Sequence, residues 1–241
     1  MNIPKQANVI IIGGGVIGCS IAYHLGKLGW KDIVLLERKK LTSGTTWHAA
    51  GLIAQLRATQ NMTRLAKYSQ ELYWDLEKET GVVTGFKRNG SMTVALTEER
   101  LEELNRQADM ARAYDVEIEN INKSQIQERY PHLNTEDVLG GVWLPKDGQA
   151  DPVNITLALA KGARNFGVTI IEDLKVNSIE TNDGKVKAVR THQGLINANY
   201  IVNAGGMWGQ EIGNMAGASV PLHACEHFYI VTEPIDNLTP E

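Results

Sequence analysis

The sequence predicts an α/β fold built around a parallel sheet, and three features of its first forty residues carry that prediction. Residues 9–12 form a short apolar run of β-branched residues, which is typical of a strand buried on both faces. A glycine-rich segment and an apolar pattern with helical spacing follow. A second apolar run, residues 33–36, then ends on Glu37. Strand, helix and strand in this order predict a βαβ unit with two parallel strands.

The glycine-rich segment has the spacing of a dinucleotide-binding motif. Gly13, Gly15 and Gly18 stand at G-x-G-x-x-G spacing. The first glycine permits a tight turn out of the strand, the second lets a pyrophosphate approach the backbone, and the third lets the helix pack closely on the sheet. The helix N-terminus offers N–H donors to the phosphates. Glu37, about twenty residues after Gly18, is placed to bind ribose hydroxyls. The sequence therefore predicts a Rossmann-like dinucleotide site.

Composition places the chain among ordinary soluble globular proteins. It has 241 residues, 43% hydrophobic and 22% charged, which is enough for one large domain or two smaller ones. A net charge of −4 gives no electrostatic reason to expect nucleic acid or an anionic membrane as a partner. Only Cys19 and Cys225 are present, so neither a disulfide framework nor a metal site is predicted. The apolar stretch 9–22 is too short to span a bilayer, and we expect a cytoplasmic protein.

The regular alternation of strand and helix stops after Glu37. Residues 39–60 read as an irregular loop that carries several hydroxyl groups together with Trp47 and His48. A nicotinamide-binding domain would continue with another crossover, so an NAD-linked dehydrogenase is disfavoured. A loop rich in such groups beside a nucleotide site is a candidate for contact with the far end of the cofactor.

The middle of the chain reads as an alternation of helices and strands. A helix is predicted over residues 63–80, ended by Gly81. Strands near 82–86 and 91–96 are predicted to form a hairpin through the dipeptide at 89–90. The remaining predictions are a helix capped by Thr97, a short helix over 122–130 and a strand over 138–144.

The last third returns to strands and ends on a second strand-to-glycine junction. Asp151 followed by Pro152 predicts the start of a helix that runs to Phe166. Strands are predicted over 168–171, 175–181, 186–191, 196–202 and 223–233. The strand over 196–202 runs into a glycine pair, and a short helix follows. Two such junctions suggest that loops of one sheet meet an extended ligand from two sides.

Four motifs resemble the dimethylglycine dehydrogenase and sarcosine dehydrogenase family, within the D-amino-acid-oxidase-like flavoproteins. They are residues 42–52 (TSGTTWHAAGL), 147–152 (DGQADP), 201–208 (IVNAGGMW) and 227–232 (HFYIVT). The resemblance runs nearly end to end. It implies a glutathione-reductase-like, FAD-binding parallel-sheet domain with an interleaved antiparallel-sheet substrate domain. The implied division is 1–60 and 150–217 for FAD, and 61–149 and 218–241 for substrate.

The resemblance implies FAD as the cofactor. In this family the histidine at the position of His48 is bonded to the 8α-carbon of the flavin, and we expect the same here. The alternative is a loop histidine that only packs or hydrogen-bonds. The residues that the resemblance implies along the cofactor are Gly13, Gly15, Gly18, Glu37, Arg38, Ser43, Thr45, Thr46, Val176, Gly205, Gly206 and Trp208.

The implied reaction is oxidative demethylation of dimethylglycine or sarcosine by hydride transfer to the flavin, with electrons passed to an electron-transfer flavoprotein. A base with a pKa near neutrality would keep the amine lone pair free. His227 resembles a family active-site histidine, and Tyr229 shares its strand face. The alternative for His227 is a strand histidine bonded to a backbone carbonyl. No arginine stands out as the partner of the substrate carboxylate.

Two other functions stay open at this point. One is an oxygen-using sarcosine or dimethylglycine oxidase of the same superfamily, and the other is a non-catalytic flavin-binding subunit. Proteins of the family continue past the position of Glu241 into a folate-binding domain, so tetrahydrofolate is expected only through a domain absent from this chain. The chain therefore looks truncated, and the isolated fragment is expected to hold FAD poorly and to turn over little.

Overall fold

The computed structural model describes residues 3–235, which divide into two compact units. Within the described residues, unit 1 contains 3–50, 76–84 and 151–227, and unit 2 contains 51–75, 85–150 and 228–235. Helix α2 (Gln60–Thr80) contributes to both. The assignment of FAD and substrate to separate domains stays a prediction.

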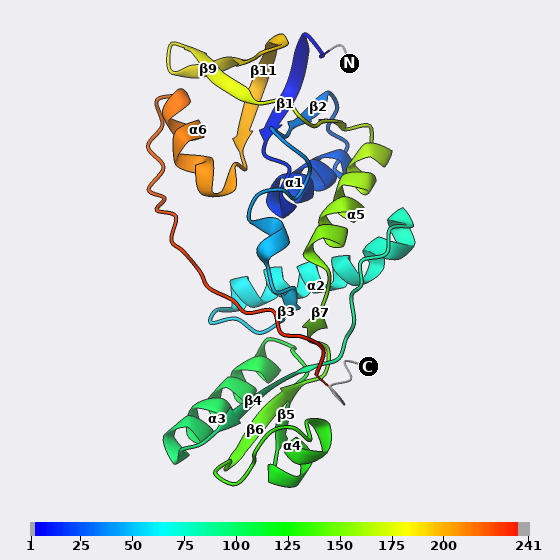
Figure 1. Cartoon of the computed structure of the whole chain (residues 1–241), viewed down its shortest axis with the longest axis vertical. Helices are drawn as coiled ribbons and strands as arrows, with labels where there is room; N and C mark the ends of the chain where they lie inside the picture. Colours follow the sequence, from blue (N-terminus) through cyan, green and yellow to red (C-terminus); the bar gives the residue numbers. More distant parts are fainter. Residues whose placement is uncertain (1–2, 236–241) are drawn as a thin grey trace. The chain divides into compact units, whose positions relative to one another are not determined.

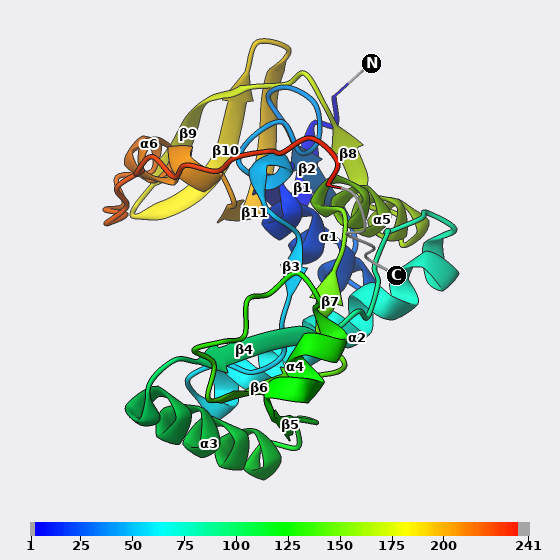
Figure 2. The same cartoon turned by 60° about the horizontal axis from the view of Figure 1, so that its bottom comes forward.

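Unit 1 is built on the parallel-dominated sheet that the sequence predicts (Figures 1 and 2). Its strand order is β8-β2-β1-β11-β10-β9. β1 pairs in parallel with both β2 and β11, β2 pairs in parallel with β8, and β10 pairs antiparallel with its two neighbours. The strands are β1 (Gln6–Ile12), β2 (Ile33–Leu36), β8 (Thr169–Ile171), β9 (Val176–Asn182), β10 (Lys185–Thr191) and β11 (Gly194–Asn203).

Helices cover this sheet, and its central strands are buried on both faces. Helices α1 (Val16–Lys27) and α5 (Pro152–Asn165) pack against each other and contact β2 and β8 respectively, while α6 (Gly209–Met215) contacts β9 and β11. Ile10 belongs to a core cluster that includes Ile212 of α6. Ile11, which alternates with Ile10, is also fully buried. Burial on both faces explains the uninterrupted apolar run of the first strand.

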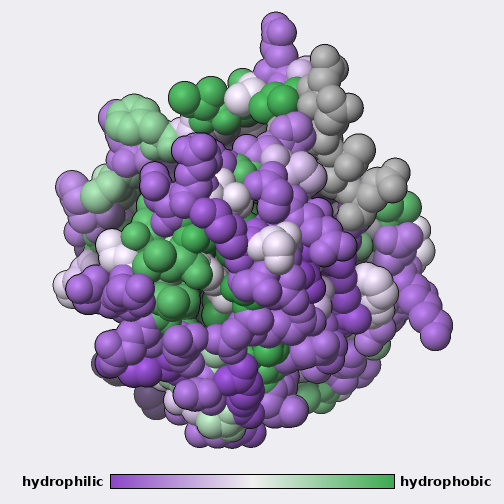
Figure 3. Space-filling view, turned by 90° about the horizontal axis from the view of Figure 1, so that it is seen from below, coloured by the Kyte–Doolittle hydropathy of each residue, from purple (hydrophilic) through white to green (hydrophobic). Residues whose placement is uncertain are grey.

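Unit 2 is an antiparallel sheet with helices. Strands β4 (Ser91–Ala95), β6 (Gly140–Leu144) and β5 (Glu119–Ile121) pair in that order, and β3 (Leu52–Ile53) pairs with β7 (Gly148–Gln149). Helix α3 (Glu98–Ala113) begins at the predicted cap, where the Thr97 hydroxyl accepts a hydrogen bond from the Arg100 N–H at 3.2 Å. Helix α4 (Lys123–Arg129) is capped by Asn122. The face drawn in Figure 3 is mostly hydrophilic, with apolar side chains gathered in a few patches.

Two predicted strands are wrong. Residues 82–86 form no strand, because Gly85 takes a positive φ of 65° and the Thr84 N–H bonds the Glu77 side chain; only Lys87 pairs, in a single bridge to Gln149. The predicted hairpin at 89–90 is therefore absent. Residues 223–233 are exposed and form no strand, since they join no β-ladder with the described strands.

A buried carboxylate holds three segments of unit 2 together. Asp147 is 2% exposed, and its carboxylate accepts hydrogen bonds from the Ser91 hydroxyl at 2.6 Å and from the Gln55 N–H at 2.9 Å. Both donors are neutral, so burial dominates and raises the pKa of Asp147 above its usual value. A raised pKa means that the folded state holds the proton more tightly than the unfolded chain. The contribution of Asp147 to the free energy of unfolding therefore falls as the pH rises from the ordinary pKa of the unfolded chain through the raised pKa of the folded state.

We expect Asp147→Leu to unfold far more easily than Asp147→Asn. Leucine leaves the Ser91 hydroxyl and the Gln55 N–H buried without acceptors, at a cost of roughly 2 kcal/mol or more. Asparagine keeps Oδ1 as the acceptor for the Gln55 N–H, its Nδ2 can donate to the Ser91 hydroxyl oxygen, and the titration is abolished. Urea unfolding at a series of pH values from 3 to 7 measures both effects. If the stability of Asp147→Asn follows pH as steeply as that of the parent, the buried carboxylate is not the source of the dependence.

Candidate cofactor site

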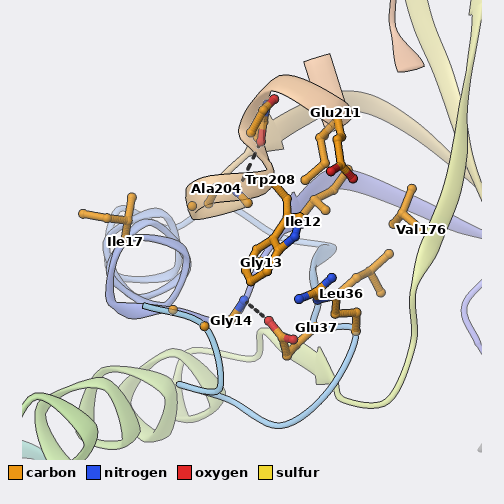
Figure 4. Close-up of a pocket in the computed structure, with 18 of the residues that line it drawn as sticks. Ile12, Gly13, Gly14, Ile17, Leu36, Glu37, Val176, Ala204, Trp208 and Glu211 are labelled. Atoms are coloured by element: carbon orange, nitrogen blue, oxygen red, sulfur yellow. Dashed lines mark hydrogen bonds between the residues drawn. The ribbon is translucent and has the colours of Figure 1, made fainter. Parts of the chain in front are cut away.

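A cavity of about 430 Å³ lies in unit 1, where β1, β2 and β11 end. In parallel sheets ligands bind at the carboxyl ends of the strands, where crossovers leave in opposite directions. Figure 4 shows residues that line it. Most of the predicted cofactor residues meet here, from five separate stretches of the chain: Gly13, Gly15, Glu37, Arg38, Ser43, Thr45, Thr46, Val176, Gly205, Gly206 and Trp208.

The glycine turn after β1 is packed against the ends of both neighbouring strands. The Gly13 N–H donates to the Leu36 carbonyl at 2.9 Å, and the Ala204 N–H donates to the Ile12 carbonyl at 2.9 Å. Gly13 has a φ of +116°, and a Cβ there would lie 2.3 Å from the Ala204 carbonyl oxygen. A Cβ on Gly18 would lie 1.9 Å from the Gly13 carbonyl oxygen. Gly18 does not line the cavity; it lets α1 approach the turn.

Glu37 fixes the same turn from the end of β2. Its side chain is buried, and one carboxylate oxygen accepts from the Gly14 N–H at 2.7 Å while the other accepts from the Lys39 N–H at 2.8 Å. Each carboxylate oxygen has a second lone pair, so hydrogen bonds from ribose hydroxyls remain possible. The sequence indicated the ribose role; the bond to Gly14 adds a structural one.

The mouth of the cavity carries a stacked pair of side chains. The Arg38 guanidinium lies over the Trp208 indole, with its central carbon 3.7 Å from the ring centroid. Arg38 follows β2 and Trp208 follows β11, the two strands that flank β1. Figure 4 shows the indole pointing toward the glycine turn. The stack therefore links the end of β2 to the strand-to-glycine junction that follows β11.

Sequence reasoning missed Glu211, which lines the same cavity from the first turn of α6. Its position three residues after Trp208, in the helix that follows the second junction, is the signal that could have found it. Lys175, one residue before Val176, also lines the cavity and was missed.

Besides Gly18, three predicted site residues do not line this cavity. His48 ends the short 3₁₀ turn η1 (Thr46–His48) and is exposed, with its ring centroid 3.7 Å from that of Trp47. His227 and Tyr229 lie in the exposed segment that forms no strand. The flavin role of His48 and the catalytic roles of His227 and Tyr229 stay predictions.

The cavity fits the adenosine diphosphate part of FAD. Its glycine turn leaves room for a pyrophosphate against the backbone, a 12-residue helix begins beside it, and a carboxylate stands at the end of the second strand. The described helices include none long and apolar enough to cross a membrane. Residues 3–235 contain no cluster of three or more His, Cys, Asp or Glu side chains suited to a metal ion.

Comparison with known proteins agrees with this geometry. The model of the DAO family, described as FAD-dependent oxidoreductases, matches residues 8–241. The chain belongs to this family. Its fold is shared with the crystal structure of L-proline dehydrogenase from P. horikoshii, with a TM-score of 0.84 and 29% identity over 89% of this chain and 57% of that one.

Several curated relatives match almost the whole chain. Rat dimethylglycine dehydrogenase is 42% identical over 95% of the chain, mouse sarcosine dehydrogenase is 41% identical over 98%, and the mouse pyruvate dehydrogenase phosphatase regulatory subunit is 41% identical over 97%. The chain covers 27%, 26% and 27% of these proteins, respectively. It thus spans about a quarter of their length.

Proposed function

We propose that this chain carries the FAD-binding part of an enzyme that oxidatively demethylates an N-methylglycine, either dimethylglycine or sarcosine. The observation that carries the proposal is the cavity between two strand-to-glycine junctions, with the Thr-Trp-His turn beginning at its wall. The similarity to dimethylglycine and sarcosine dehydrogenases supports the substrate class.

Each part of the cavity has a role in holding FAD. The glycine turn and the N-terminus of α1 hold the pyrophosphate, Glu37 binds the ribose, and the backbone at Val176 meets the adenine. When bound, FAD supplies a hydride acceptor for the N-methyl carbon. His227 would accept the proton that otherwise blocks the amine lone pair, and Tyr229 is the second catalytic residue of the proposal. Electrons then leave to an electron-transfer flavoprotein. A cytoplasmic location remains a prediction that cell fractionation tests.

We further propose that His48 is bonded covalently to the flavin. Attachment forms a C–N bond between an imidazole nitrogen and the 8α-carbon. The imidazole loses its N–H proton and the 8α-carbon loses one C–H proton. The electron pair released goes to the flavin ring, from which dioxygen takes it as the oxidant. Support comes from Thr46, which begins the turn that ends at His48 and itself lines the cavity.

Denaturing electrophoresis after incubation with FAD and oxygen tests the covalent bond. We expect a fluorescent flavin band, with the flavin on the peptide that contains His48. His48→Ala should bind FAD reversibly and lose the band entirely. A parent chain that releases all its flavin on denaturation would falsify the covalent proposal.

A non-catalytic flavin-binding subunit is the second candidate, favoured by the similarity to a regulatory subunit. The two candidates differ in one measurement. In the complete protein loaded with FAD, dimethylglycine or sarcosine should reduce the flavin of an enzyme and bleach its visible absorbance in the absence of oxygen. The flavin of a regulatory module should keep its absorbance. An oxygen-using oxidase would reoxidise with oxygen faster than with an artificial dye, and a dehydrogenase would do the reverse.

A further inference from the structure

Helix α1 has a side-chain cap that comes from a distant loop. Its own N-cap residue is Gly15, which has no side chain to accept a hydrogen bond. The Val16 N–H instead donates to the Thr46 hydroxyl oxygen at 3.0 Å, across 30 residues of sequence. A threonine hydroxyl in this place satisfies one of the unpaired N–H groups of a helix N-terminus, as an ordinary N-cap does.

The loop is fitted to the glycine turn around this contact. A Cβ on Gly15 would lie 2.9 Å from the Thr46 hydroxyl oxygen, so the glycine leaves the space that the hydroxyl occupies. Thr46 is buried, and the Thr42 N–H donates to the Gly14 carbonyl at 3.0 Å. Thr42 takes a φ of +72°, a strained conformation for a β-branched residue that persists only where the surroundings fix it. The loop is thus held to the turn at two points.

The capping hydroxyl and the exposed imidazole belong to one turn of backbone. η1 begins at Thr46 and ends at His48, and it is closed by hydrogen bonds of 3.2 Å from the His48 N–H to the Thr45 carbonyl and from the Ala49 N–H to the Thr46 carbonyl. The hydrogen bond between Thr46 and α1 therefore also fixes the position of the His48 backbone, two residues further along the same turn. The same helix end is the one that holds the pyrophosphate.

We propose that Thr46 is a positioning residue for flavin attachment, an inference that rests on the proposed covalent role of His48. By capping α1, Thr46 sets the distance between the pyrophosphate-binding helix and the imidazole. Attachment joins an imidazole nitrogen to the 8α-carbon with loss of one proton from each, and dioxygen takes up the electron pair. Bond formation of this kind is sensitive to misplacement by about 1 Å. Thr46 acts through the helix and the turn.

The test compares three variants after incubation with FAD in air. Thr46→Val keeps the shape of the side chain and removes the hydroxyl acceptor, while Thr46→Ser restores it. Thr97→Val is the matched control, because it removes a hydroxyl cap of the same kind from α3, in unit 2. We expect Thr46→Val to attach flavin at least tenfold more slowly than the parent, Thr46→Ser to attach it near the parental rate, and Thr97→Val to be less heat-stable with unchanged attachment.

A second readout needs no FAD. The imidazole signals of His48 in the NMR spectrum of the FAD-free chain, assigned with His48→Ala, should shift in Thr46→Val and stay in place in Thr97→Val. Parental attachment in Thr46→Val would overturn the inference, as would equal slowing in Thr97→Val. If the parent chain attaches no flavin, the proposed covalent role of His48 is wrong. The NMR comparison still tests the positioning role separately: His48 signals that do not shift in Thr46→Val would show that Thr46 does not position the imidazole.

Discussion

Gly13→Ala is expected to raise the Kd for FAD at least 100-fold. The new methyl group would lie 2.3 Å from the Ala204 carbonyl oxygen, and that atom belongs to backbone that cannot rotate away. The φ of +116° is also one that alanine rarely adopts. The turn and the end of β11 must therefore separate, which opens the cavity. Strain of this kind costs about 3 kcal/mol of stability in addition.

Gly29→Ala is the matched control for this prediction. Gly29 also takes a positive φ, +88°, at the end of α1, and nothing lies within 4 Å of the Cβ that a substitution would add. We expect a stability loss of about 1 kcal/mol from the backbone conformation alone, with FAD affinity unchanged. Fluorescence titration with FAD and urea unfolding separate the two effects. Parental affinity in Gly13→Ala would show that the turn is not the pyrophosphate site.

Glu37→Leu is expected to weaken FAD binding by one to two orders of magnitude. The buried Gly14 N–H would lose its acceptor, at a cost of roughly 1–3 kcal/mol, and the part-buried Lys39 N–H would lose its acceptor too. The glycine turn would loosen, and the ribose would lose its carboxylate. Glu37→Gln should be milder, because its amide oxygen still serves one of the two donors.

Glu172→Gln is the comparison for Glu37. The Glu172 carboxylate accepts a hydrogen bond from the Leu41 N–H at 2.8 Å, so it also holds the loop after β2, but it does not line the cavity. FAD affinity should therefore change little. Isothermal titration measures the FAD affinity of the Glu37 and Glu172 variants. If Glu37→Gln and Glu172→Gln lose the same amount of affinity, Glu37 acts only by supporting the loop.

The first βαβ unit was predictable because its signals are local. Each signal reflects the backbone conformation or the burial of its own position: a β-branched run, glycines at fixed spacing and an acid after the second strand. The structure places β1, α1, β2 and Glu37 where the sequence predicts. The caps at Thr97 and Asp151 were predictable for the same reason: each side chain bonds an N–H two or three residues on.

The wrong strand predictions and the missed side-chain contacts depend on residues that are distant in the sequence, which a local pattern does not reveal. Residues 82–86 have strand-like composition, but the Thr84 N–H bonds the Glu77 side chain of α2, and only the next residue, Lys87, forms a bridge, to Gln149. The strand predicted over 223–233 lacks a neighbour among the described residues. Within the site, Val176 came from the family resemblance alone. The Arg38–Trp208 stack and the Thr46 cap join residues from separate segments and carry no sequence signature.

The central position of β1 has a consequence for how the chain folds during its synthesis. β1 pairs with β11 across most of the sequence, Gln6 beside Asn197 and Ile12 beside Asn203. A ribosome must therefore make about two hundred residues before β1 gains its second neighbour, and its bare apolar edge is meanwhile open to wrong pairing. Although the glycine motif is complete within the first twenty residues, FAD cannot assist early folding, because one wall of its binding site, residues 203–222, is translated about 180 residues later.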